Sequence, residues 1–175
     1  MLNKAIFLDR DGVVNKEVNY LHKTNNFEFT NGILDACKHF TNLDYKLIIV
    51  TNQSGIARGF YSDSDYEKLN QWMINQFKSH GILILDSFYC PHLPQAMCSC
   101  RKPKPGMLIS AKNKYKISMG ESWMIGDKAS DMEAAVSANI SNTIFLMDTH
   151  NTNEPLENAK YVINELVEVK KIITF

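Results

Sequence analysis

Short apolar runs alternate with longer amphipathic stretches along this chain. The short runs are rich in isoleucine, leucine, valine and aromatic residues, which is typical of strands buried on both faces of a sheet. They lie at residues 5–8, 46–50, 83–89, 123–125 and 143–146. Because helical patterns separate these strands, the sequence predicts one α/β domain of Rossmann-like type, with a parallel sheet and helices on both of its faces.

The stretches between the strands carry the apolar spacing and the end signals of helices. Apolar residues recur at helical spacing over 33–43, and Ser62 with the acids after it can begin a helix that runs to about Phe77. Residues 148–160 are polar and are expected to form a surface loop. Further helices are expected over 107–115, 130–138 and 164–173.

The composition narrows the classes of protein to consider. With 175 residues and 45% hydrophobic residues, the chain can bury one core, so 1–175 is expected to be a single domain without a large cap domain. The formal net charge of zero argues against nucleic acid or a membrane surface as the main partner. The chain has neither a membrane-spanning run nor a signal-peptide pattern, so we expect a cytoplasmic protein, and a monomer by default.

Polar and charged residues follow four of the five strands. They are, in strand order, Asp9 and Asp11, Thr51, Arg101 with Lys102, and Asp127 with Lys128 and Asp131. Singly, each has an ordinary explanation, such as a turn for Thr51, a helix N-terminus for Asp131 or solvation for Lys102. Because the carboxyl ends of parallel strands meet at one edge of a sheet, their joint occurrence predicts a common site.

This set of residues suits phosphoryl transfer through a covalent aspartyl phosphate. Asp9 would be the nucleophile. Asp11 would protonate the leaving oxygen and then take a proton from the water that hydrolyses the intermediate. A Mg²⁺ held by Asp9 and Asp127 would offset the repulsion between the attacking carboxylate and the phosphate.

Three further residues would support this chemistry. Lys102 and the hydroxyl of Thr51 would hold the remaining phosphate oxygens. Asp131 would orient the waters of the metal or the side chain of Lys102. A phospho-accepting switch would use the same aspartyl phosphate, but Asp11 is out of place there, because a switch needs a long-lived phosphoprotein.

A cluster of cysteines and a histidine forms a second candidate site. Cys90, His92, Cys98 and Cys100 lie close together in the sequence, whereas Cys37 stands alone on the apolar face of a helix. Thiolates and imidazole suit tetrahedral Zn²⁺, and four protein ligands fill its shell, so the zinc would be structural. Reduced thiols or a disulfide are the alternatives, and the expected cytoplasmic location disfavours the disulfide. The next two residues are basic, so zinc would fix the backbone that aims them at the phosphate.

Three segments resemble the motifs of the haloacid-dehalogenase-type phosphatases, namely residues 7–13, 51–59 and 126–128 with Asp131. The resemblance spans most of the chain and is strongest to the branch that acts on heptose 1,7-bisphosphate or histidinol phosphate. It implies a Mg²⁺-dependent phosphatase with a zinc loop at 90–100.

The same resemblance assigns roles to individual residues. It implies Asp9 as nucleophile, Asp11 as acid/base, and Thr51 with Lys102 as phosphate-stabilising residues. The Mg²⁺ ligands would be Asp9, Asp127 and, through its main-chain carbonyl, Asp11. The resemblance also implies the following substrate-binding residues: Glu17, Val18, Asn19, Tyr20, Asn52, Gln53, Ser54, Arg101 and Lys128.

These observations lead to a preferred function and two alternatives. The preferred one is hydrolysis of the 7-phosphate of D-glycero-D-manno-heptose 1,7-bisphosphate, a small-molecule sugar phosphate, on the route to nucleotide-activated heptose for lipopolysaccharide or surface polysaccharide. Histidinol-phosphate hydrolysis would use the same motifs, but bifunctional proteins of that pathway often carry a second domain. The third is a zinc-loop binding module on an inactive scaffold, which the intact acid pair disfavours.

Overall fold

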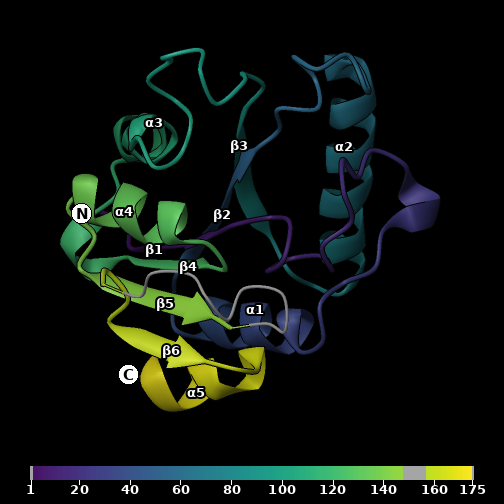
Figure 1. The fold of residues 1–175 in the computed structure, drawn as a ribbon. Coiled ribbons are helices and arrows are strands. Elements are labelled where there is room, and N and C mark those ends of the chain that lie inside the picture. The colour runs from purple at the N-terminus through teal and green to yellow at the C-terminus, as the bar shows by residue number, and fades with distance from the viewer. Residues whose placement is uncertain (1, 148–156, 175) are drawn as a thin grey trace.

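A six-stranded parallel sheet forms the centre of the computed structural model, which describes residues 2–147 and 157–174 (Figure 1). The strands lie in the order β3-β2-β1-β4-β5-β6, and every neighbouring pair is parallel. Their bounds are β1 Ala5–Leu8, β2 Lys46–Asn52, β3 Ile84–Cys90, β4 Trp123–Gly126, β5 Asn142–Leu146 and β6 Tyr161–Ile163. The α/β class and the parallel sheet expected from the sequence are confirmed.

Helices cover both faces of the sheet, so its strands are apolar on both sides. Helices α1 (Ile33–Asn42), α2 (Asp63–Ser79) and α5 (Val169–Ile172) pack on the face to which Ile6 and Leu8 of β1 point. Helices α3 (Gly106–Tyr115) and α4 (Ala129–Ser137) pack on the face of Ala5 and Phe7. All four residues of β1 are fully buried, which explains the uninterrupted apolar run in the sequence.

Two of the helices begin at residues that the sequence marks. The hydroxyl of Ser62 accepts a hydrogen bond from the backbone N–H of Asp65, whose carboxylate accepts one from the N–H of Ser62 in return. At the start of α4, the carboxylate of Asp131 accepts a hydrogen bond from the backbone N–H of Lys128. The second of these caps also fixes a side chain of the candidate site.

The C-terminal part of the chain differs from expectation. The short edge strand β6 is not predicted by the sequence, because two of its three residues, Tyr161 and Val162, are exposed and no buried run marks it. The helix expected over 164–173 is wrong in extent, since it breaks into a 3₁₀ turn, Leu166–Glu168, and the short α5. The third strand begins one residue later than expected. Of the loop expected over 148–160, residues 148–156 lie outside the described residues.

The order of the strands places a crevice beside β1. The chain passes from β1 to β2 on one side and reaches β4 on the other, so the connections diverge at the carboxyl end of β1. Open α/β sheets bind ligands at such a switch point. Among the helices in the described residues, none has both the length and the apolar character needed to cross a membrane.

Candidate active site

A cavity of about 480 Å³ lies at the carboxyl ends of β1, β2 and β4. Acids that follow β1 and β4, with Thr51 and Asn52 of β2, form its inner part, and the segment between β3 and α3 forms its outer wall. In Figure 1 this segment rises beyond the end of β3 before it descends into α3. The lining includes Asp9, Asp11, Thr51, Asn52, Met97, Arg101, Lys102, Lys128 and Asp131. The structure therefore brings together acids, a hydroxyl and cations from distant parts of the sequence.

Lys102 joins two of the acids at the base of the cavity. Its Nζ lies 2.9 Å from Oδ1 of Asp9 and 2.6 Å from Oδ1 of Asp131, and it donates a hydrogen bond of 2.8 Å to the carbonyl of Val50. Burial lowers the pKa of this amine, but the charges of Asp131 and Asp9 outweigh burial and raise it. Lys102 is therefore a fixed cation beside Asp9.

The carboxylate of Asp9 is held from one side only. Its Oδ1 accepts hydrogen bonds from the backbone N–H of Arg10, at 2.7 Å, and from Lys102. No described residue donates to Oδ2. The backbone N–H of Asp9 donates to the carbonyl of Ile125 in β4, which ties the end of β1 to its neighbour. One oxygen of the nucleophile expected from the sequence is thus fixed, and the other is available.

Asp127 and Asp131 bring two more carboxylates to Asp9. One oxygen from each of the three lies within 4.8 Å of the others, and all three side chains are buried. Burial raises the pKa of Asp127 to about 8 and the pKa of Asp131 to about 6, and the charge of Asp9 adds to both shifts. Such crowded carboxylate oxygens fit a hard divalent cation, which would stabilise their charged forms. We call Asp9, Asp127, Asp131 and Lys102 the acidic floor.

Gly12 allows the acidic floor to form. Its φ is +90°, and a Cβ at this position would lie 2.2 Å from Oδ2 of Asp127. Only glycine combines that backbone conformation with so close an approach. The glycine after the second acid of the Asp-Arg-Asp-Gly sequence is therefore needed for packing around Asp127.

The second acid after β1, Asp11, is surrounded by hydrogen-bond donors. Arg10 donates to both of its oxygens, at 2.9 Å from Nη2, and Asn15 and Gln53 donate amide hydrogen bonds of 3.0 and 2.9 Å. Burial raises the pKa of Asp11, but the charge of Arg10 and these hydrogen bonds outweigh it, so the pKa is lowered. The oxygens that would exchange protons with substrate are held in place by three side chains.

The residues at the end of β2 hold other parts of the site. The side-chain amide of Asn52 donates a hydrogen bond of 3.1 Å to the carbonyl of Lys102. It also accepts one of 3.1 Å from the backbone N–H of Lys102, so it clamps the backbone of that residue. Thr51 is buried, and its Oγ1 accepts a hydrogen bond of 2.8 Å from Nε2 of Gln53. Ser54 accepts a backbone hydrogen bond from Arg58. The side chains of Asn52 and Gln53 are thus engaged with the protein itself.

The remaining residues expected to contact substrate fall into two groups. Arg101 and Lys128 line the cavity. The segment at 17–20 does not, although Glu17 accepts a 3.1 Å bond from Nζ of Lys128. Val18, Asn19 and Tyr20 are exposed, and the ring of Tyr20 packs edge-on against Phe60 at 4.5 Å. A substrate role for these residues stays a prediction.

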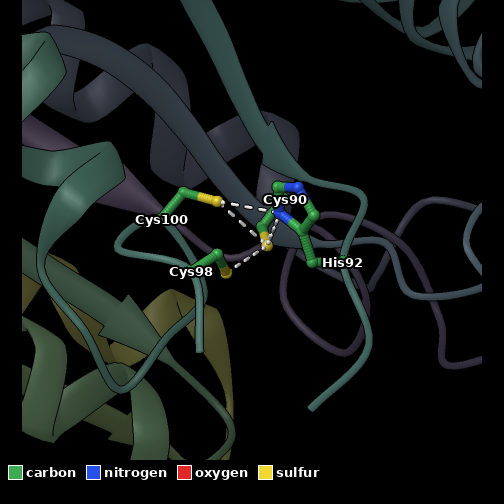
Figure 2. Close-up of side chains that lie close together, drawn as sticks. All are labelled: Cys90, His92, Cys98 and Cys100. Atoms are coloured by element: carbon green, nitrogen blue, oxygen red, sulfur yellow. Dashed lines mark hydrogen bonds between the residues drawn. The ribbon is translucent and has the colours of Figure 1, made fainter. Parts of the chain in front are cut away.

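The Cys/His loop (residues 90–100) brings its four candidate ligands together, as Figure 2 shows. Sγ of Cys90 lies 3.6 Å from that of Cys98 and 3.2 Å from that of Cys100. Nδ1 of His92 lies 3.5 Å from Sγ of Cys90 and 3.3 Å from Sγ of Cys100. Zinc–sulfur bonds of about 2.3 Å give tetrahedral S···S edges of about 3.8 Å. The spacing therefore fits one metal ion bound by all four residues.

Three residues that contact Asp11 or its partner Gln53 are not predicted from the sequence. Arg10 is fully buried despite its charge, and Asn15 and Tyr61 are buried polar residues of loops. The position of Arg10 between two acids is a local signal that could identify it. Asn15 and Tyr61 carry no such signal, because their contacts are set by how distant loops fold together.

Comparison with known proteins gives a consistent result. The HAD-hydrolase-like family model matches residues 99–169. A D-glycero-alpha-D-manno-heptose-1,7-bisphosphate 7-phosphatase of Photorhabdus laumondii is 46% identical over 97% of this chain and 96% of that protein. A D-glycero-beta-D-manno-heptose-1,7-bisphosphate 7-phosphatase of Escherichia coli K12 is 40% identical over 97% of this chain and 93% of that protein. The chain belongs to this family of HAD-like phosphatases.

A solved structure supports the same assignment. The D,D-heptose 1,7-bisphosphate phosphatase of B. bronchiseptica, crystallised with magnesium and phosphate, is 30% identical and has a TM-score of 0.85. The match covers 97% of each chain. The protein is therefore a phosphatase of the HAD-like fold, as the resemblance of its motifs implies.

Proposed function

We propose that this phosphatase hydrolyses the 7-phosphate of a D-glycero-D-manno-heptose 1,7-bisphosphate, with Mg²⁺ bound at the acidic floor. This reaction would serve the synthesis of nucleotide-activated heptose for lipopolysaccharide or surface polysaccharide. The observation that carries the proposal is the position of Asp9, with one oxygen fixed by Lys102 and the other open, among the carboxylates of Asp127 and Asp131. The names of the relatives, at 40% to 46% identity, supply the substrate.

The reaction would proceed in two displacements. In the first, Oδ2 of Asp9 attacks phosphorus, the bond between phosphorus and the sugar oxygen breaks, and Asp11, which must carry a proton for this step, gives it to that oxygen. In the second, Asp11 takes a proton from water, the water oxygen attacks phosphorus, and the bond to Asp9 breaks to release inorganic phosphate. Lys102 and the hydroxyl of Thr51 hold phosphate oxygens throughout both steps.

Two metals are proposed, with different roles. Mg²⁺, held by Asp9, Asp127 and the main-chain carbonyl of Asp11, would neutralise charge on the phosphate during transfer. Zn²⁺ in the Cys/His loop would be structural, since four protein ligands leave no open position. Its position next to Arg101 would fix the wall of the cavity.

The cations at the mouth of the cavity suit a substrate with more than one phosphate. Arg101 and Lys128 line the same cavity but are not part of the acidic floor, whereas Lys102 belongs to the floor and would contact the reacting phosphate. One phosphate would react beside Asp9, and the outer cations would bind the other. A cytoplasmic monomer acting on a small sugar phosphate, without a nucleic-acid or membrane partner, remains our expectation.

A comparison of substrates tests the proposal. Pure enzyme with Mg²⁺ should release phosphate from heptose 1,7-bisphosphate, tested as both anomers, with a kcat/KM at least 100-fold above that for histidinol phosphate. The Asp9→Asn variant should lose activity by about 1,000-fold or more while it stays folded, because the amide is a poor nucleophile. Preference for histidinol phosphate would instead identify the alternative substrate. Absence of Mg²⁺-dependent hydrolysis in the wild type would favour the binding module.

A further inference from the structure

The phenol of Tyr61 lies behind the acid pair, at the end of a chain of short hydrogen bonds. Tyr61 precedes the N-cap of α2 and is buried. Its hydroxyl donates a hydrogen bond of 2.6 Å to Oε1 of Gln53. The amide of Gln53 in turn donates hydrogen bonds of 2.9 Å to Oδ2 of Asp11 and of 2.8 Å to Oγ1 of Thr51. One phenol therefore reaches two residues of the proposed reaction through a single amide.

The chemistry of the partners fixes the direction of each bond. An ionised carboxylate can only accept, so the NH₂ end of the Gln53 amide must face Asp11. The carbonyl end then faces Tyr61, which must donate. Burial raises the pKa of Tyr61 to about 12, so the phenol keeps its proton near neutrality. Without that donor, the buried carbonyl of Gln53 would lose its partner, and the amide would be held in place only by its bonds to Asp11 and Thr51.

The orientation of this amide also determines how Thr51 can act. Because Oγ1 of Thr51 accepts from Gln53, its own proton must point elsewhere. No described residue accepts that proton, and Thr51 lines the cavity. The hydroxyl is therefore poised to donate to an anion in the cavity, such as a phosphate oxygen.

We propose that Tyr61 is a positioning residue for this phosphatase: it holds the Gln53 amide in the one orientation that places both the Asp11 carboxylate and the Thr51 proton for reaction. The inference rests on the proposed function, since it takes the roles of Asp11 and Thr51 from it. It also gives Gln53 a task different from the substrate contact implied by the resemblance.

The surroundings of Tyr61 are shaped to hold its ring. A Cβ at position 55 would lie 2.2 Å from Cε1 of Tyr61, so Gly55 provides the space that the ring fills. On another side the ring of His22 stacks on it, at 5.1 Å between centroids and 12° between planes. A phenylalanine would keep these contacts and remove only the hydroxyl, so Tyr61→Phe isolates the hydrogen bond.

The first experiment compares Tyr61→Phe with Tyr66→Phe. Tyr66 is a buried tyrosine nearby whose hydroxyl lies 3.4 Å from Ser87 and does not bond to Gln53. We expect Tyr61→Phe to lower kcat for the sugar bisphosphate by about 5- to 10-fold with KM changed less than about twofold. Tyr66→Phe should leave both constants near wild type. Thermal unfolding of the two variants should show that both remain folded.

A double-mutant cycle then separates a positioning role from a structural one. Gln53→Met removes the amide at similar volume, so adding Tyr61→Phe to it should cost less than about twofold further in kcat. Equal kcat for Tyr61→Phe and wild type would overturn the inference. It would also be overturned if Tyr61→Phe lowered kcat in the Gln53→Met background by as much as it does in the wild type. A wild-type enzyme that releases no phosphate would instead count against the proposed function, so the two failures are distinguishable.

Discussion

The acidic floor is held by the core of the protein, whereas the Cys/His loop lies largely outside that core. Asp9, Asp127, Asp131 and Lys102 are all buried. Asp9 and Asp127 directly follow strands, Asp131 lies in the first turn of α4, and Lys102 lies in the segment that leads to α3. In the loop only Cys90 is buried, and Met97 at its tip is 87% exposed. The two regions meet at the wall of a single cavity.

The difference shows two ways to preorganise one site. In the floor, strand pairing and ion pairs to Lys102 fix the carboxylates of Asp9 and Asp131. The loop has few backbone hydrogen bonds of its own, and its four candidate ligands contact one another. In the proposed mechanism, the chemistry is thus built on the rigid part, and the contacts to the rest of the substrate would lie next to the part that a metal would stabilise.

Replacement of Lys102 by methionine should break the floor most severely. Asp9 and Asp131 would keep their burial and lose their shared cation, so both kcat and stability should fall. We expect kcat to fall by about 1,000-fold. We also expect the free energy of unfolding to fall by about 3 kcal/mol. Phosphate release and urea unfolding measure the two effects. The exposed lysine Lys112, changed in the same way, is the matched control. A kcat within tenfold of wild type would contradict the assigned role.

Loss of a proposed zinc ligand in Cys100→Ser should damage the loop and spare the floor. Zinc content should fall, and amides of 91–101 should exchange hydrogen faster, while those of the sheet stay protected. Since Arg101 directly follows the loop, kcat/KM should fall by about 100-fold. The contrasting control is Cys37→Ala, because Cys37 is buried in α1. It should lower the melting temperature and leave zinc and kcat unchanged. Full activity in a zinc-free protein would show that the loop needs no metal.

The same contrast explains what the sequence can predict. Buried parallel strands appear as continuous apolar runs, so β1 could be located to the residue, and the polar residues after each run converge because parallel strands share an edge. The ligands of the Cys/His loop are also local in sequence. Both candidate sites could therefore be found before the structure.

What the sequence does not predict depends on contacts between distant segments. Asn52 was expected to touch substrate, yet its amide bonds to a backbone fifty positions further along. Asn15 donates to Asp11 and Tyr61 donates to Gln53 through loop geometry that no periodicity encodes. The edge strand β6 is missed because a three-residue strand with two exposed residues leaves no clear pattern.

The mildest change concerns Asn52, the residue that joins the two regions. Its amide clamps the backbone of Lys102. The backbone N–H of Gln53, the residue after Asn52, donates a hydrogen bond of 2.7 Å to the carbonyl of Cys90. In Asn52→Ala the two clamp bonds are lost, but Lys102 keeps its bonds to the acids of the floor, so we expect only about a tenfold fall in kcat with little change in KM. Steady-state kinetics measure this.

The exposed residue Asn75 of α2, changed to alanine, is the control for the Asn52 variant and should behave as wild type. The division of the loss between kcat and KM carries the argument. A residue that positions Lys102 acts on the transferring phosphate and lowers kcat, whereas a residue that binds the sugar in the ground state raises KM. If Asn52→Ala raises KM at constant kcat, the clamp is dispensable, and Asn52 returns to the substrate contact that the resemblance implies.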